Sequence, residues 1–131
     1  MKKILVIEDD RGVRDYLITI LVRAGYTAVA ARDGQEGVKL HRRAPADVVI
    51  TDIIMPEKDG IETILDLRRT NPVPRVIAIS GGGHISADDY LRSATMLGAD
   101  LALCKPFTGD EILTAVDRLH ADGTNSDEQP D

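Results

Sequence analysis

The sequence predicts an α/β fold in which a doubly wound parallel sheet is covered by helices on both faces. Along the 131 residues, five short apolar runs alternate with five longer amphipathic segments. Aromatic residues make up only 3% of the chain, so the apolar runs are aliphatic, as buried parallel strands usually are. Strict alternation of strands and helices requires crossover connections, which are right-handed and build such a sheet.

The predicted strands are the five short runs. None shows the alternation of apolar and polar residues that marks a strand with one face in water. We therefore expect all five to be buried between two helical layers. The runs cover residues 4–7, 27–31, 48–51, 76–79 and 101–104.

The predicted helices are the segments between and after these strands. The first carries Val13 and Leu17 on one face and stops at Gly25. The second begins at Asp33, a residue type that caps helix N-termini. The last opens at residues 108–111 with the capping-box pattern TGDE. The helices are expected over residues 10–24, 33–43, 59–70, 86–97 and 108–120.

Length and composition indicate one soluble domain. The pattern fills residues 1–120, and residues 121–131 are polar and acidic, so we expect a short disordered tail there. A net charge of −6 repels nucleic acid phosphates, so direct binding to DNA or RNA is not expected. No apolar run approaches the roughly 20 residues that span a bilayer. The one cysteine, Cys104, cannot form an internal disulfide, which favours a cytoplasmic location.

Polar residues collect where the predicted strands end. In an open parallel sheet the C-terminal ends of the strands share one edge, where ligands bind if the strand order reverses. Residues from distant parts of the sequence are therefore expected to meet there. They are Glu8, Asp9 and Asp10 after the first strand, Asp52 after the third, Ser80 after the fourth and Lys105 after the fifth.

Several carboxylates at one edge require compensating positive charge. Two of them ~5 Å apart repel by roughly 3 kcal/mol at an effective dielectric of about 20. Lys105 supplies one positive charge, and a hard divalent cation such as Mg²⁺, which prefers oxygen ligands, supplies the rest. A carboxylate beside a cation, a lysine and a hydroxyl suits phosphoryl transfer onto Asp52.

Four motifs, in this order, resemble the receiver domain of two-component response regulators, over residues 2–120. The resemblance implies a flavodoxin-like receiver fold with strand order 2-1-3-4-5. That order reverses between the first and third strands, which would place Glu8, Asp9 and Asp52 side by side. The motifs are residues 4–10 (ILVIEDD), residues 52–56 (DIIMP) leading to Asp59-Gly60, then Ser80, then residues 105–107 (KPF).

The resemblance also implies a role for each site residue. Asp52 matches the phosphoacceptor, while Ser80 and Lys105 match the groups that contact the phosphoryl group. The Lys105–Pro106 bond is expected to be cis, which is inexpensive only before proline. Among the acids, Asp9 matches a direct Mg²⁺ ligand and Glu8 one that reaches the metal through water. The implied metal site therefore consists of Glu8, Asp9, Asp52 and the main-chain carbonyl of Ile54.

A single-domain response regulator is the function that the resemblance implies. A histidine kinase or a histidine phosphotransfer protein would donate the phosphoryl group in a Mg²⁺-dependent reaction. The phosphorylated protein would signal through contact with an unidentified downstream protein or by onward phosphotransfer. It would be a monomer or a phosphorylation-dependent dimer, would bind neither nucleic acid nor membrane, and would act as a phosphoacceptor rather than as an enzyme on separate substrates.

The sequence departs from the family pattern at three places. Ala102 stands where the family usually carries a Tyr or Phe that moves with the hydroxyl, so a different rearrangement must carry the output. Residues 81–83 (GGG) give the next loop unusual conformational freedom, and we expect that loop to be the mobile output element. Ile54 is expected to slow hydrolysis of the phosphoryl-aspartate by covering the path of the attacking water.

Two other classes of function compete with this interpretation. A Mg²⁺-dependent phosphohydrolase needs a general acid two residues after its nucleophile, and residue 54 is Ile. A phosphorylation-independent binding module with a receiver fold would use the acidic site only structurally. The full set of acids, Ser80 and Lys105 argues against such a module, although Ala102 leaves it open.

The remaining candidates for chemistry receive structural roles. The histidines show no spacing typical of metal ligands, so His41, His84 and His120 are all expected at the surface. Cys104 is expected to be a buried strand residue, because no basic group is placed to activate its thiol.

Overall fold

A computed structural model of the chain describes residues 2–53, 60–80, 92, 95–96 and 98–128, with side chains through Leu119. The strands are β1 (Lys3–Ile7), β2 (Thr27–Ala31), β3 (Val48–Asp52), β4 (Arg75–Ser80) and β5 (Leu101–Cys104). The helices are α1 (Arg11–Arg23), α2 (Gly34–Arg43), α3 (Gly60–Arg68) and α5 (Gly109–Glu128). The helix expected over residues 86–97 lies outside the described residues except for isolated positions.

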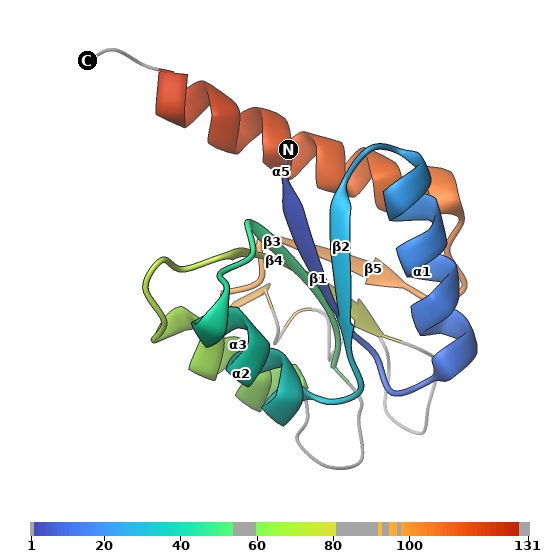
Figure 1. The fold of residues 1–131 in the computed structure, drawn as a ribbon, viewed down its shortest axis with the longest axis horizontal. Helices are drawn as coiled ribbons and strands as arrows, with labels where there is room; N and C mark the ends of the chain where they lie inside the picture. The colour runs from blue at the N-terminus through green and yellow to red at the C-terminus, as the bar shows by residue number, and fades with distance from the viewer. Residues whose placement is uncertain (1, 54–59, 81–91, 93–94, 97, 129–131) are drawn as a thin grey trace.

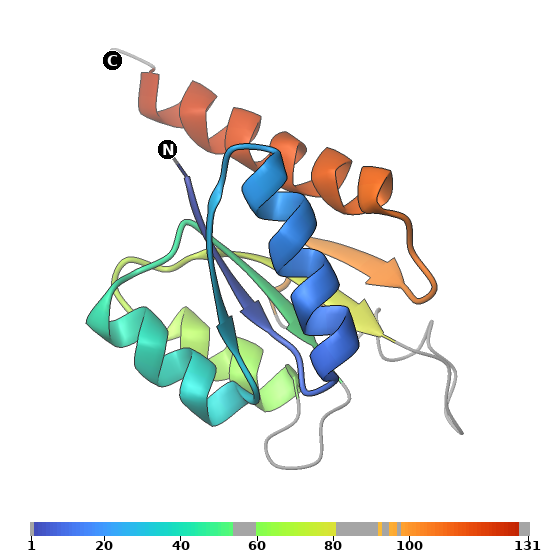
Figure 2. The ribbon, with the colours of Figure 1, turned by 45° about the vertical axis from the view of Figure 1, so that its right-hand side comes forward.

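The five strands form one parallel sheet in the order β2-β1-β3-β4-β5, which confirms the predicted fold class. Helices α1 and α5 lie on one face of this sheet, and α2 and α3 lie on the other (Figures 1 and 2). The strand order reverses between β1 and β3, which pair directly, with Ile7 opposite Thr51. The residues that follow β1 and those that end β3 therefore lie next to each other.

Two hydrophobic cores, one on each face of the sheet, explain why the strands are apolar throughout. Successive side chains of a strand point to opposite faces. In β3, Val49 packs in the cluster with α2 and α3 residues, whereas its neighbour Ile50 packs in the cluster with α1 and α5 residues. Both side chains are fully buried, and burial of such a side chain contributes roughly 1.5–3 kcal/mol.

Side-chain caps fix the helix starts where the sequence predicts them. The first N–H groups of a helix have no partner within it, so a side-chain oxygen commonly accepts from them. Asp10 Oδ1 accepts from the Val13 N–H at 3.0 Å at the start of α1. At the start of α5, the hydroxyl of Thr108 accepts from the Glu111 N–H, and Glu111 accepts in return from the Thr108 N–H. The predicted capping box is thereby confirmed.

Helix α5 continues further than predicted. It runs from Gly109 to Glu128, so residues 121–128, expected as a disordered tail, are helical. Adding a residue to an existing helix gains a hydrogen bond, while only nucleation is costly, so a packed first half can be followed by a polar second half. The packed half is anchored by Ile112, Ala115, Val116 and Leu119.

No helix in the described part of the chain combines the length and apolar character needed to cross a membrane.

The surface position expected for His41 is wrong. Its side chain is 1% exposed, because the last turn of α2 packs against two loops. Nδ1 accepts from the Ala46 N–H at 3.0 Å, which leaves Nε2 to donate to the Pro72 carbonyl at 3.1 Å. The imidazole thus satisfies two backbone groups that would otherwise be buried without partners.

The burial expected for Cys104 is also wrong. Cys104 is exposed, because it ends β5, which is an edge strand of the sheet. The other residues of that strand are only half-buried. A strand at the edge lacks a neighbour on one side, so an apolar run there does not guarantee full burial.

The first residue of α3, Gly60, lies against the end of β3. Its N–H donates to the Ile53 carbonyl at 3.1 Å. A Cβ added to Gly60 would lie 2.2 Å from Ile53 Cα and 2.5 Å from the Asp52 carbonyl oxygen. Because these are backbone atoms, they cannot move aside as the end of a flexible side chain can. Glycine therefore permits α3 to begin this close to Asp52.

We predict that Gly60→Ala lowers the free energy of unfolding by about 1–3 kcal/mol, the usual cost of overpacking. Gly12→Ala in α1 is the matched control, because its added Cβ would meet only the end of the Asp10 side chain, at 3.3 Å. Urea unfolding followed by circular dichroism measures both variants. Equal stability of the two would contradict the prediction.

Candidate functional site

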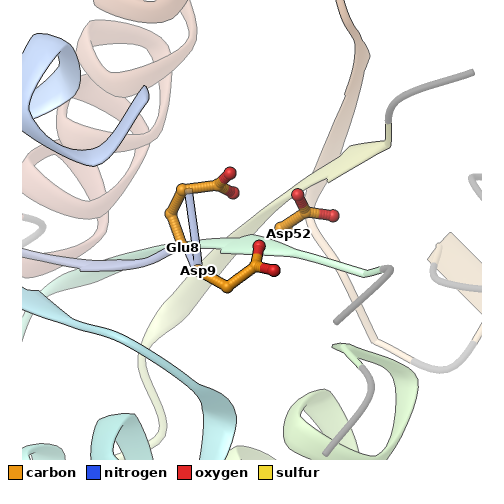
Figure 3. A group of neighbouring side chains, drawn as sticks. All are labelled: Glu8, Asp9 and Asp52. Atoms are coloured by element: carbon orange, nitrogen blue, oxygen red, sulfur yellow. The ribbon is translucent and has the colours of Figure 1, made fainter. Parts of the chain in front are cut away.

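The structure brings the predicted acidic residues together at one edge of the sheet. Glu8 and Asp9 directly follow β1, and Asp52 is the last residue of β3. One carboxylate oxygen from each of the three lies within 4.8 Å of the others. Figure 3 shows the carboxylates of Glu8 and Asp9 pointing toward Asp52. The strand reversal between β1 and β3 produces this arrangement, as the family resemblance implies.

Lys105 joins two of these carboxylates. Its Nζ donates to Asp52 Oδ2 at 2.8 Å and to Glu8 Oε1 at 3.1 Å. Glu8 is 0% and Asp52 4% exposed, so both ion pairs lie largely out of water. The Lys105 N–H also donates to the Ser80 carbonyl at 2.7 Å, which fixes the backbone at the end of β5. The Lys105–Pro106 bond is cis, as expected.

Burial makes the charged form of Glu8 costly. Desolvation, followed by the hydrogen bond and the negative charge of Asp52, raises the pKa of Glu8 from 4.5 to about 8, although Lys105 acts in the opposite direction. Burial alone would lower the pKa of Lys105, but the hydrogen bond and charge of Asp52, together with those of Glu8, raise it above its ordinary value. Lys105 therefore stays protonated and offsets only part of the negative charge.

The donor set fits a hard divalent cation. Among the described side chains, Glu8 Oε2 is a buried oxygen without a hydrogen-bond partner. Asp9 is exposed and opens the cluster to water. Mg²⁺ uses carboxylate oxygens together with several waters, so a partly exposed carboxylate cluster suits it. Glu8, Asp9 and Asp52 are the residues that would hold the ion.

Of the remaining predicted site residues, some are described by the structure and others lie outside the described residues. Ser80 is 0% exposed and ends β4, one residue beyond Ile79, which pairs with Asp52 in the sheet. The role of its hydroxyl stays a prediction. The Ile54 carbonyl and the loop with residues 81–83 lie outside the described residues. Ala102 is half-buried in β5 and lines a hollow of about 420 Å³ between β5 and α5.

Arg14 is a site neighbour that the sequence analysis missed. Its Nη1 donates to the Glu8 carbonyl at 2.9 Å and approaches the Asp9 carbonyl at 3.5 Å. The available signal was its position near the start of α1. The positive end of the helix dipole disfavours a basic residue at that position, so a hydrogen-bond acceptor outside the helix is expected to stabilise its side chain.

The raised pKa of Glu8 predicts a pH dependence of stability in the metal-free protein. In the folded state Glu8 holds a proton that the unfolded chain releases near pH 4.5. The contribution of this proton to the free energy of unfolding is therefore complete below pH 4.5 and is lost as pH rises through about 8. The free energy of unfolding, measured with a chelator present, is expected to fall by at most about 1.4 kcal/mol per pH unit in this window.

Glu8→Gln should flatten that profile, since a glutamine does not titrate. Glu36→Gln is the control, because Gln can replace Glu in the cap of α2. Urea unfolding at several pH values gives the comparison. Parallel profiles for the wild type and Glu8→Gln would contradict the assignment.

Comparison with known proteins agrees with this geometry. The family described as "response regulator receiver domain" matches residues 4–117. The transcriptional regulatory protein CpxR of Escherichia coli K12 is 32% identical over 116 residues, 88% of this chain and 48% of its own length. The response regulator MprA of a Mycobacterium species is 35% identical over 130 residues, 98% of this chain and 54% of its own. The chain thus spans about half the length of these curated relatives.

Solved structures extend the likeness to the whole fold. A receiver domain of a Francisella response regulator superposes with a TM-score of 0.84 at 30% identity, covering 94% of this chain and 99% of that one. A receiver domain protein from Clostridium thermocellum gives a TM-score of 0.85 at 27% identity, covering 95% and 98%. With a family match over nearly its whole length and the acidic cluster at the expected strand ends, the chain belongs to the receiver domain family of two-component response regulators.

Proposed function

We propose that Asp52 accepts a phosphoryl group in a Mg²⁺-dependent reaction and that the protein works as a switch in two-component signalling. The observation that carries this proposal is the bridge from Lys105 to Asp52 and Glu8, beside the carboxylate of Asp9. A structural ion pair would need one carboxylate for one lysine. Here Lys105 contacts two acids and a third lies beside them, so ionisation of all three leaves net negative charge that a divalent cation would offset.

In the proposed step, an Asp52 carboxylate oxygen attacks the phosphorus of the donor. An O–P bond forms while the bond from phosphorus to the leaving group breaks, and the leaving group keeps that electron pair. The Lys105 ammonium, which now donates to Asp52, would shift to an oxygen of the phosphoryl group. It thereby keeps a hydrogen-bonded anionic partner before and after transfer.

Glu8, Asp9 and Asp52 would hold Mg²⁺, with the Ile54 carbonyl as a further ligand implied by the family. When bound, the ion supplies neutralisation of charge on the transferring phosphoryl oxygens. Glu8 would be ionised in that state, because a nearby cation favours the charged form of a carboxyl. Ser80 would donate its hydroxyl to the phosphoryl group from the end of β4.

The partners we propose follow from the chemistry of this step. A histidine kinase or a histidine phosphotransfer protein would donate the phosphoryl group, as receiver domains use such donors. Output would pass through contact with another protein or by onward phosphotransfer. The net charge of −6 disfavours contact between this domain and DNA, although curated relatives such as CpxR are named transcriptional regulatory proteins.

We further propose that the domain is a phosphoacceptor rather than a hydrolase of separate substrates. A hydrolase with an aspartate nucleophile needs a general acid two residues further on, and residue 54 is Ile. Ala102 is the observation that favours the other candidate, a phosphorylation-independent binding module, because no aromatic side chain at that position is there to couple to Ser80.

Incubation with acetyl phosphate and Mg²⁺ should add one phosphoryl group, detected as an increase in intact mass. The adduct should disappear with a chelator and in Asp52→Asn, because both the ion and the nucleophile are required. Asp33→Asn is the matched control, since it makes the same exchange at the cap of α2, where Asn caps as well as Asp.

A folded wild type that takes up no phosphoryl group with Mg²⁺ would favour the binding module. An adduct that persists in Asp52→Asn would move the acceptor to another residue. Either result would overturn the proposed function.

A further inference from the structure

The loop between β1 and α1 is held by α1 itself. The Asp10 side chain caps the helix, and the Arg14 N–H donates to the Asp10 carbonyl at 2.9 Å. The Arg14 guanidinium then reaches back along the loop to the carbonyls of Glu8 and Asp9. One residue of α1 therefore contacts the backbone of every residue between β1 and the helix.

The remaining backbone group of Glu8 is also fixed. Its N–H donates to the Ala31 carbonyl at the end of β2, at 3.1 Å. With its N–H bound by β2 and its C=O bound by Arg14, the peptide groups on both sides of Glu8 have one orientation. For Asp9, the described contact on the carbonyl side is Arg14, at 3.5 Å. Because Asp9 is exposed, its carboxylate depends more on this contact than the buried Glu8 does.

Arg14 is not placed where helix stability alone would favour an arginine. It lies in the N-terminal part of α1, near the positive end of the helix dipole. Its neighbour Arg11 pairs with Asp15 at the surface, at 3.7 Å. Among the described residues, Arg14 has no such ion pair and is half-buried. Within the described part of the chain, its side-chain hydrogen bonds go to the two carbonyls of the acidic pair.

We infer that Arg14 is a positioning residue for the acidic site, which holds Glu8 and Asp9 so that their carboxylates converge on Asp52 and bind Mg²⁺. The inference rests on the proposed function, because the converging carboxylates are taken to bind the Mg²⁺ that phosphorylation of Asp52 requires. The carbonyls that Arg14 contacts belong to the residues whose carboxylates face Asp52, so loosening them would spread the carboxylates over more positions. Groups that orient metal ligands in this way commonly change metal affinity 10–100-fold.

Two explanations of the role of Arg14, by its charge alone or by its positioning of the carboxylates, predict opposite changes in Mg²⁺ affinity when Arg14 is removed. If only its charge mattered, loss of a cation near a cation site would tighten Mg²⁺ binding. If it positions the carboxylates, its loss weakens Mg²⁺ binding instead. The sign of the change separates the two explanations.

The test measures the dissociation constant of Mg²⁺ for the unphosphorylated protein by calorimetric titration of wild type, Arg14→Met and Arg14→Lys. We expect a rise of ~10-fold in Arg14→Met. Arg14→Lys should fall between Arg14→Met and the wild type, since an ammonium keeps the charge but lacks the planar set of N–H groups.

A second readout separates positioning from a role in the reaction itself. Phosphorylation by acetyl phosphate is followed as a function of Mg²⁺ concentration. The half-saturating Mg²⁺ concentration should rise by the same factor as the dissociation constant, while the rate at saturating Mg²⁺ stays close to that of the wild type. A merely destabilised fold would not produce this split.

Two control variants complete the design. Arg11→Met removes an arginine from the same turn that contacts neither carbonyl, and it should leave Mg²⁺ affinity unchanged. Asp47→Ala removes the carboxylate that accepts from the Lys3 N–H, at the end of the sheet opposite the acidic site. It shows what a general loss of stability does to Mg²⁺ binding.

Arg14→Met that binds Mg²⁺ as tightly as the wild type, or more tightly, would overturn the inference. If Arg14→Met does not fold, wild-type affinity in Arg14→Lys would overturn it as well. A wild type that binds Mg²⁺ but takes up no phosphoryl group would instead sink the proposed function, and the binding measurement would still decide the role of Arg14.

Discussion

The shared ion pair of Lys105 with Asp52 and Glu8 is the interaction on which the rest of the site depends. A fully buried Glu8 is tolerated because burial raises its pKa to about 8, so that it holds a proton in the metal-free protein, and because the ammonium donates to one of its oxygens. The ammonium reaches both acids because β5 pairs with β4 and β4 with β3, so the ends of β5 and β3 come to the same edge. The order of the strands thus determines which charged groups meet at this edge. When the acids are ionised, these groups carry net negative charge, which favours binding of a cation.

The edge of the sheet that carries Glu8, Asp52 and Lys105 could be predicted from the sequence, because the ends of parallel strands share one edge once the alternation of elements is recognised. The strand order itself came from the family resemblance, since apolar runs carry no information on which strand is central. His41, Cys104 and Arg14 were misjudged or missed for a common reason. Each depends on which loops and strands pack beside it, and local periodicity does not report such neighbours. The continuation of α5 escaped prediction because composition says little about whether an existing helix goes on.

Fold and function rest on different observations in this protein. The superposition with receiver domains shows the scaffold, and scaffolds of this kind host unrelated functions. The acidic cluster with its lysine is the part that specifies chemistry. Ala102 stands where the family resemblance leads one to expect an aromatic residue, and it lines a hollow of about 420 Å³ together with other residues of β5 and α5. Under the proposed function, signal output would therefore use a surface built differently from that of relatives with an aromatic residue there.

The two ends of the sheet differ in how completely their buried polar groups are hydrogen-bonded. At the end where β3 and β4 begin, the His41 imidazole satisfies backbone groups of both preceding loops. At the other end, Glu8 keeps a buried oxygen without a described partner. Such a contrast is the mark of a trade-off between stability and activity, in which an active site retains groups that folding alone would discard. Selection of variants for thermal resistance alone would therefore be expected to replace Glu8 early, and, under the proposed function, the more stable proteins would have lost a Mg²⁺ ligand.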